Sequence, residues 1–155
     1  MKKERKTARQ ILSGNPREVI SVRPADSVLT ALRLMADKDV TTVLVLQSSN
    51  LVGILSQRDY ARKVELAGRN ATETKVGEIM TTEVLYVTPE HTCDRCLALM
   101  HTRRIRHLPV IDSGKVIGVL SNSDVLEELI QEDEHFISIL EHDMLYLTVD
   151  TGGAY

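Results

Sequence analysis

The chain carries one segment of sequence twice. When the sequence is shifted against itself by 65 residues, Val19–Asp59 aligns with Val84–Asp124 without a gap. Twelve of the 41 aligned positions hold the same residue; in the first copy they are Val19, Val22, Pro24, Leu32, Leu34, Met35, Val45, Ser48, Gly53, Leu55, Ser56 and Asp59. Such a repeat predicts two copies of one supersecondary unit that bury their apolar faces together. It also predicts a pseudo-twofold axis with two related clefts between the copies.

Length and composition limit the partners that such a pair can have. The 155 residues are enough for one compact domain or two small repeats around a shared core, and 43% of them are hydrophobic. The net charge of −3 provides no general attraction to nucleic acid, and no apolar run approaches the roughly 20 residues that span a bilayer. Two cysteines without a recognisable secretion signal favour a reducing, cytoplasmic setting.

The hydrophobic pattern predicts the same five elements in each copy, in the order β-α-β-β-α. A proline ends the first strand, and apolar residues then recur at helical spacing, as in Val28, Ala31, Leu32 and Met35. The strands expected in the first copy are 19–22, 42–46 and 51–55. Those expected in the second copy are 84–87, 107–111 and 116–120. The closing helices are expected at about 56–66 and 121–130. The predicted fold is therefore a mixed α+β fold made of two repeats.

Segments outside the repeat complete the predicted organisation. A short helix over Thr7–Leu12 is expected to stop at Gly14, and the tail combines an amphipathic helix around Phe136, Ile139 and Leu140 with a short strand. The expected divisions are an N-terminal segment (1–18), the first repeat (19–68), a connector (69–80), the second repeat (81–131) and a C-terminal helix and tail (132–155).

The junction between the last strand and the closing helix has the same signature in both copies. It reads Gly53-Ile-Leu-Ser56-Gln-Arg-Asp59 in the first and Gly118-Val-Leu-Ser121-Asn-Ser-Asp124 in the second. The Ser-x-x-Asp pattern is typical of a capping box, which is a purely structural role. A helix N-terminus also suits a phosphate, a carboxylate there can accept hydrogen bonds from two ribose hydroxyls, and the glycine permits close approach. Both interpretations remain open from the pattern alone.

These motifs, in this order and twice, resemble a tandem pair of CBS domains, the unit called a Bateman module. The resemblance rests on Val-Arg-Pro and Val-Thr-Pro after the first strands, on Arg106-His-Leu-Pro-Val110 and on the two junctions, and it extends over about 19–131. It implies that adenosine-containing ligands such as AMP, ATP or NAD bind in the clefts. It further implies a ribose held by Asp59 or Asp124, with Ser56 or Ser121 near sugar or phosphate. The residues implied around the adenine are Ile20, Thr42, Val43, Leu85, His107 and Leu108.

The charges are not repeated. The closing helix of the first copy carries Arg58, Arg62 and Lys63, and the loop before the middle strand of the second copy carries Arg104 and Arg106. Arg58 and Arg62 share a helix face because they are four residues apart. Solvated surface is the plain interpretation of such residues. Our hypothesis is one electropositive well that binds phosphates, built from the four arginines with Lys63 and His107 at its rim.

Two cysteines in the second copy allow three interpretations. His91, Cys93, Cys96 and His101 could be drawn as a zinc site, and Cys-x-x-Cys could be a redox pair. Cys93 and Cys96 align with Val28 and Ala31, however, on the apolar face of a helix. Burial in the core is therefore favoured, and no metal is expected.

The sequence thus leaves three functions in competition. The favoured one is a regulatory module, expected to be a homodimer, that senses an adenine nucleotide and signals to a partner protein. The alternatives are a structural or dimerisation protein whose Ser-x-x-Asp boxes are only caps, and a redox-linked protein that uses Cys93 and Cys96. No catalytic triad, phosphate-binding loop or metal triad is present, so an enzyme is not expected.

Overall fold

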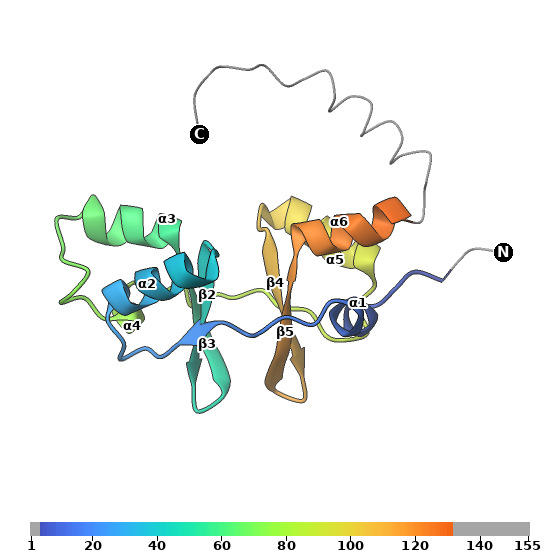
Figure 1. Cartoon of the computed structure of the whole chain (residues 1–155), viewed down its shortest axis with the longest axis horizontal. Helices are drawn as coiled ribbons and strands as arrows, with labels where there is room; N and C mark the ends of the chain where they lie inside the picture. Colours follow the sequence, from blue (N-terminus) through green and yellow to red (C-terminus); the bar gives the residue numbers. More distant parts are fainter. Residues whose placement is uncertain (1–3, 132–155) are drawn as a thin grey trace, which may run out of the picture.

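The computed structural model describes residues 4–131, in which two repeats lie side by side with their hairpins at the centre (Figure 1). The first repeat contains β1 (Ser21–Val22), α2 (Val28–Lys38), β2 (Thr42–Gln47), β3 (Asn50–Ser56), α3 (Gln57–Tyr60) and the π-helical η1 (Ala61–Glu65). The second contains α5 (Cys93–Arg103), β4 (His107–Asp112), β5 (Lys115–Ser121) and α6 (Asn122–Gln131). Two short helices, α1 (Ala8–Gly14) and α4 (Val76–Ile79), precede the repeats. The predicted α+β fold of two repeats is confirmed, and the predicted tail (132–155) lies outside the described residues.

The strands pair alike in both repeats, except where the second repeat has a proline. In the first, β1 runs parallel to β2, which pairs antiparallel with β3. In the second, β4 and β5 form the equivalent hairpin, but the strand predicted at 84–87 is reduced to one parallel bridge between Val87 and Val110. The Leu44 N–H donates to the carbonyl of Ile20 in the first repeat. Pro109 is the equivalent of Leu44 and has no N–H to donate, so the ladder ends there.

Both hairpins turn in two residues that have positive φ angles. The turn residues are Ser48 (φ 50°) and Ser49 (φ 68°) in the first hairpin, and Ser113 (φ 51°) and Gly114 (φ 80°) in the second. Positive φ at both positions is what a type I′ turn requires, and that turn matches the twist of the strands. The same turn therefore fixes the same register in both repeats.

Each repeat has its own aliphatic core, and each core is completed by the short helix that precedes the other repeat. Val76 and Ile79 of α4 pack with the first repeat, whereas Ala8 and Ile11 of α1 pack with the second. Backbone hydrogen bonds follow the same pattern. The Val76 N–H donates to the backbone carbonyl of Asp26, and the Ala8 N–H donates to the backbone carbonyl of His91, which is the equivalent of Asp26. The two helices therefore join the repeats into one body.

The duplicated glycines of the junctions are explained by these helices. A Cβ on Gly53 would lie 2.6 Å from Sδ of Met80, which follows α4, and a Cβ on Gly118 would lie 2.8 Å from Cδ2 of Leu12 in α1. Both distances are shorter than van der Waals contact. The close approach predicted at these glycines is therefore made by the protein's own helices.

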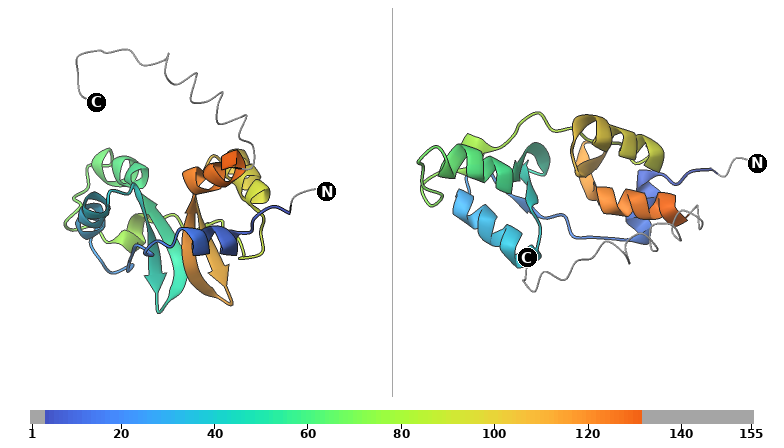
Figure 2. Two further views of the ribbon diagram at one scale, coloured as in Figure 1. Left: turned by 45° about the vertical axis from the view of Figure 1, so that its right-hand side comes forward. Right: turned by 90° about the horizontal axis from the view of Figure 1, so that it is seen from above.

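The helices of each repeat gather on its own side of the molecule, α2 and α3 on one and α5 and α6 on the other (Figure 2). Between them β3 and β5 lie side by side, which brings the two strand-to-helix junctions toward the centre (Figure 1). The fold therefore places the functional candidates of both repeats around the line where the repeats meet.

Candidate functional site

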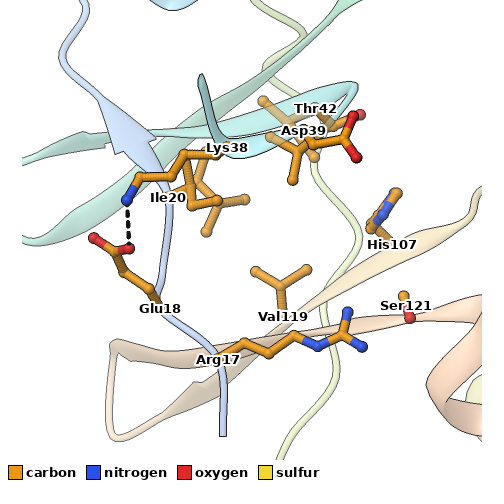
Figure 3. Close-up of a pocket in the computed structure, with 12 residues that line it drawn as sticks. Arg17, Glu18, Ile20, Lys38, Asp39, Thr42, His107, Val119 and Ser121 are labelled. Atoms are coloured by element: carbon orange, nitrogen blue, oxygen red, sulfur yellow. Dashed lines mark hydrogen bonds and ion pairs between the residues drawn. The ribbon is translucent and has the colours of Figure 1, made fainter. Parts of the chain in front are cut away.

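A cleft of about 330 Å³ lies between the two repeats (Figure 3). The segment 17–20, the end of α2 and the strands β2 and β3 supply one part of its lining, and β4 and β5 supply the other. The lining residues are Arg17, Glu18, Ile20, Lys38, Asp39, Val40, Thr42, Leu44, Ile54, His107, Val119 and Ser121. Such a volume lies at the lower end of the range of about 300–1,000 Å³ that is usual for small-molecule sites.

The Asp124 carboxylate is not part of the cleft lining, but it bonds to two lining residues, Ser121 and Arg17. Asp124 is the third residue of α6, and its side chain is only 7% exposed. Its Oδ2 accepts a hydrogen bond from the Ser121 backbone N–H (3.2 Å), while the Ser121 Oγ accepts one from the Asp124 N–H (3.1 Å). This reciprocal pair is the capping box that the sequence predicts.

The other oxygen of Asp124 binds groups from outside the repeat. Oδ1 accepts hydrogen bonds from Nη2 of Arg17 at 2.7 Å and from Nδ2 of Asn15 at 3.3 Å. Arg17 and Asn15 belong to the segment that joins α1 to β1. The carboxylate therefore has a charged partner already, and a ribose diol would have to share or replace it.

The junction of the first repeat has the same design with a different cation. Asp59 Oδ2 accepts hydrogen bonds from the N–H and hydroxyl of Ser56 at 3.0 and 3.1 Å. Its Oδ1 lies 3.1 Å from Nζ of Lys63 and accepts a hydrogen bond from the hydroxyl of Thr81 at 3.2 Å. Lys63 also donates to the carbonyl of Ile79 at 2.9 Å, so its ammonium is committed to this internal network.

Two further groups set the electrostatics of the cleft. Nζ of Lys38 lies 3.0 Å from Oε2 of Glu18, and both side chains line the cleft (Figure 3). His107 is half-buried opposite them, and its burial lowers the pKa of the imidazole below the ordinary value of 6.5. The Asp124 carboxylate opposes this shift, whereas Arg106 and Arg17 add to it. At neutral pH the imidazole is therefore neutral and able to form hydrogen bonds with an uncharged ring.

Of the side chains that sequence reasoning assigned to the site, Ile20, Thr42, His107 and Ser121 line the cleft. Val43 and Leu108 are buried in the cores of their repeats, because alternation along a strand turns them away from the face of their neighbours. Leu85 is partly exposed and does not line this cleft.

Of the residues predicted to form the electropositive well, only His107 lines the cleft. Its four arginines are Arg58, Arg62, Arg104 and Arg106; all are exposed and none lines the cleft. Lys63 is exposed beside Asp59, and His107 is the one member of the group that reaches the lining. The well stays a prediction.

Sequence reasoning missed the two cations that do line the cleft, Arg17 and Lys38. Arg17 precedes the repeated segment, and the first 18 residues were expected to form a separate N-terminal segment. The repeat itself could have identified Arg17. Extending the 65-residue alignment toward the N-terminus pairs Arg17 with Thr82, and these residues follow α1 and α4 in the same way. Thr81, beside it, bonds to Asp59 as Arg17 bonds to Asp124.

The cysteine pair lies in the core of the second repeat, as the repeat alignment favours. Cys93 and Cys96 are both inaccessible on α5, and burial raises the pKa of Cys96 to about 11. Nδ1 of His91 contacts Thr88, and residues 4–131 contain no group of three or more His, Cys, Asp or Glu side chains placed to hold a metal ion.

With this geometry in view, comparison with known proteins identifies the family. The model of the CBS domain matches residues 15–66 and again residues 76–131. The chain belongs to the CBS-domain family. CBS domains are regulatory modules, and many of them bind adenosine-containing ligands. The expected tandem pair is thereby confirmed.

Relatives occur among plant and bacterial CBS-domain proteins. The mitochondrial protein CBSX3 of Arabidopsis thaliana is 39% identical over 112 residues, which are 69% of this chain and 54% of that protein. YhcV of Bacillus subtilis is 30% identical over 108 residues, 70% of this chain and 76% of that one. The chain thus spans about half the length of the Arabidopsis protein.

Solved structures show the same fold. One from Burkholderia ambifaria, described as a signal-transduction protein with CBS domains, is 43% identical, with a TM-score of 0.77. The match covers 83% of this chain and 96% of that one. A CBS-domain protein of Agrobacterium tumefaciens is 26% identical with a TM-score of 0.72, over 79% and 98% of the two chains. Among residues 4–131 of our chain, no helix is long and apolar enough to cross a membrane.

The cleft and the residues beside it combine apolar surface, hydrogen-bonding groups and positive charge. Ile20, Leu44, Ile54 and Val119 supply apolar surface of the kind that an adenine ring contacts. Asp124 and Ser121 provide hydrogen-bonding groups suited to a ribose, and Arg17 and Lys38 provide positive charge suited to a phosphate. Apolar walls with a few converging polar groups are what small-molecule sites generally have.

Proposed function

We propose that this protein is a regulatory module that binds an adenine nucleotide, AMP, ATP or NAD, in the cleft between its two repeats and signals to a partner protein. One observation carries the proposal. The buried carboxylate of Asp124 bonds to Ser121 and Arg17, and both of these residues line a cleft that the two repeats build together. A carboxylate in this position can accept hydrogen bonds from both hydroxyls of a ribose, while the apolar walls receive the base.

Signalling would follow from the position of the cleft. Its walls come from β2 and β3 of one repeat and from β4 and β5 of the other. A ligand that contacts both walls stabilises the arrangement of the repeats that fits it best, and it disfavours the others. We therefore expect ligand binding to change the surface that the two helix pairs present to a partner.

Titration calorimetry of the full chain with AMP, ATP and NAD, and with GMP as the comparison ligand, tests the proposal. An adenine nucleotide should bind, and Asp124→Asn should weaken its binding about tenfold or more, because a neutral amide accepts weaker hydrogen bonds than a carboxylate. The matched control is Asp37→Asn, which removes an exposed carboxylate on α2 outside the cleft lining. It should bind like the wild type.

A second function is favoured by a specific observation. The carboxylates of Asp59 and Asp124 both close a capping box. Each also already forms an ion pair with a side chain of the protein itself, Lys63 and Arg17 respectively. A structural or dimerisation protein would need no more than this. If no adenine nucleotide binds and none raises the midpoint of thermal unfolding, this second function replaces the first. A ligand at 100 times its dissociation constant would add about 2.7 kcal/mol of stability.

The proposal includes the assembly and the setting of the protein. We expect a homodimer in the cytoplasm, without catalytic activity of its own, that acts on a regulated partner. A cyanobacterial CBS-CP12 protein, 26% identical with a TM-score of 0.69, is described as a hexamer, which supports self-association in general. The redox alternative is disfavoured because Cys93 and Cys96 are inaccessible and the pKa of Cys96 is raised to about 11.

A further inference from the structure

We propose that Arg17 occupies the ribose-binding carboxylate in the free protein and moves to the phosphate when a nucleotide binds, so that the cleft selects nucleotides over nucleosides. This inference rests on the proposed function, and it names a phosphate-binding residue that lies outside the repeated segment. It also defines the ligand class more narrowly, as an adenosine carrying at least one phosphate.

First, a ribose diol and Arg17 would compete for one oxygen atom of Asp124. Asp124 Oδ2 is engaged by the Ser121 N–H, which belongs to the helix cap and is fixed by the backbone. Oδ1 is engaged by Arg17 at 2.7 Å and more weakly by Asn15 at 3.3 Å. A ribose diol needs acceptor sites on the carboxylate, and Oδ1 is the oxygen whose partners are side chains. The Arg17 contact is therefore the one that a diol would replace.

Second, the Arg17 side chain can leave Asp124 easily. Its side chain is 55% exposed, whereas that of Asp124 is 7% exposed. No other hydrogen bond or ion pair of the Arg17 side chain occurs within residues 4–131 beyond this one to Asp124. A guanidinium held at one end by a single partner and otherwise in solvent can change partner with little loss of packing.

Third, the phosphate of the nucleotide offers the freed guanidinium a new partner. Arg17 already lines the cleft, and its guanidinium points across the cleft toward Ser121 (Figure 3). A nucleotide whose ribose lies on Asp124 has its phosphate one or two bonds beyond the sugar, within the reach of an arginine side chain. The fork of a guanidinium matches two phosphate oxygens, so the exchange replaces one charge-assisted contact with another. A nucleoside breaks the Arg17–Asp124 ion pair without offering this replacement.

Because Arg17 has two roles, its removal should change the affinities for adenosine and for AMP in opposite directions. This makes the inference testable. In Arg17→Ala, adenosine no longer competes with a guanidinium for Asp124, so its affinity should rise about threefold or more. AMP loses its phosphate contact, so its affinity should fall about tenfold or more. A residue that only shaped the cleft would change both affinities in the same direction.

The experiment is titration calorimetry of the full chain with adenosine and AMP, using wild type, Arg17→Ala and the control Arg33→Ala. Arg33 is an exposed arginine of α2 outside the cleft lining, so its replacement removes the same charge and should leave both affinities unchanged. Circular dichroism confirms folding, and Arg17→Met, which keeps an unbranched apolar stem, replaces Arg17→Ala if that variant fails to fold.

Each outcome decides the matter. A rise for adenosine together with a fall for AMP supports the exchange. If the wild type binds AMP and the variant shows any other result, including a change in only one of the two affinities, the exchange is wrong and the nucleotide-binding function stands. If the wild type binds neither adenosine nor any adenine nucleotide, the function and the inference fall together.

Discussion

The contact between Gly118 and α1 gives a quantitative test of how the repeats are joined. A Cβ added to Gly118 would lie 2.8 and 2.9 Å from the two terminal methyl carbons of Leu12. Carbon atoms in proteins pack at about 3.5–4.0 Å, so Leu12 must retreat by roughly 1 Å. Overpacking of this kind costs about 1–3 kcal/mol. Alanine in a strand regains about 0.5 kcal/mol relative to glycine. We expect Gly118→Ala to lower the free energy of unfolding by about 0.5–2.5 kcal/mol.

The assay is a double-mutant cycle by urea unfolding with wild type, Gly118→Ala, Leu12→Ala and the double variant. Leu12→Ala removes all three atoms that a Cβ at position 118 would meet, so in that background Gly118→Ala should raise the free energy of unfolding by about 0.5 kcal/mol. The coupling energy should then equal the overpacking cost of about 1–3 kcal/mol, which is within the range found for residues in contact. Equal costs of Gly118→Ala with and without Leu12 would refute the reasoning.

The equivalent glycine of the first repeat supplies a contrast. A Cβ on Gly53 would meet Met80 at 2.6 Å and also the backbone carbonyl of Thr81 at 3.1 Å. That carbonyl accepts a hydrogen bond from Ile54 at 2.9 Å and cannot move freely. Trimming Met80 to alanine should therefore rescue Gly53→Ala only in part.

Two further predictions concern the titratable groups. Because burial lowers the pKa of His107 below 6.5, the unfolded chain takes up a proton first as the pH falls, so stability should be full above about pH 6.5 and decline below it. Urea unfolding at pH 7.5 and 5.5 should show a smaller acid-side loss for His107→Gln than for the wild type; equal losses would contradict this. Because burial raises the pKa of Cys96 to about 11, native protein at pH 7.5 should resist alkylation by iodoacetamide at Cys96, and unfolded protein should react fully. Rapid modification of the native thiol, read by mass spectrometry, would show that α5 opens.

The sequence predicts the repeats well because their identical residues have local roles. Gly53 and Ser56 mark the same junction as Gly118 and Ser121, and the capping boxes follow from their spacing alone. The strand boundaries were predicted to within about one residue for both hairpins. The shortened first strand of the second repeat was missed, because it depends on which residue lies opposite, and that residue is Pro109.

The cleft was harder to predict because it depends on contacts between distant segments. Thr42 and His107, which the resemblance places beside an adenine, lie at the starts of equivalent strands and line the cleft; their contact with a ligand stays a prediction. Arg17 was missed because nothing local to it signals that the N-terminal segment crosses to the second repeat. Lys38, the last residue of α2, was missed because its place in the cleft depends on how the two repeats meet. Val43 was also expected near the adenine, but strand alternation places its side chain in the core, on the opposite face from Thr42. The periodicity of the strand already contained that information.

The crossed placement of α1 and α4 has a consequence for how the protein is made. The first core, completed by α4, is contiguous in sequence, so it can close soon after Met80 leaves the ribosome. The second core needs α1, which is synthesised first, and β5 and α6, which end at Gln131. At 5–20 residues per second, the apolar face of α1 waits on the order of ten seconds for its partners. A nascent chain arrested between the repeats should therefore present one finished half and one segment, α1, whose apolar residues are still exposed and available to a chaperone.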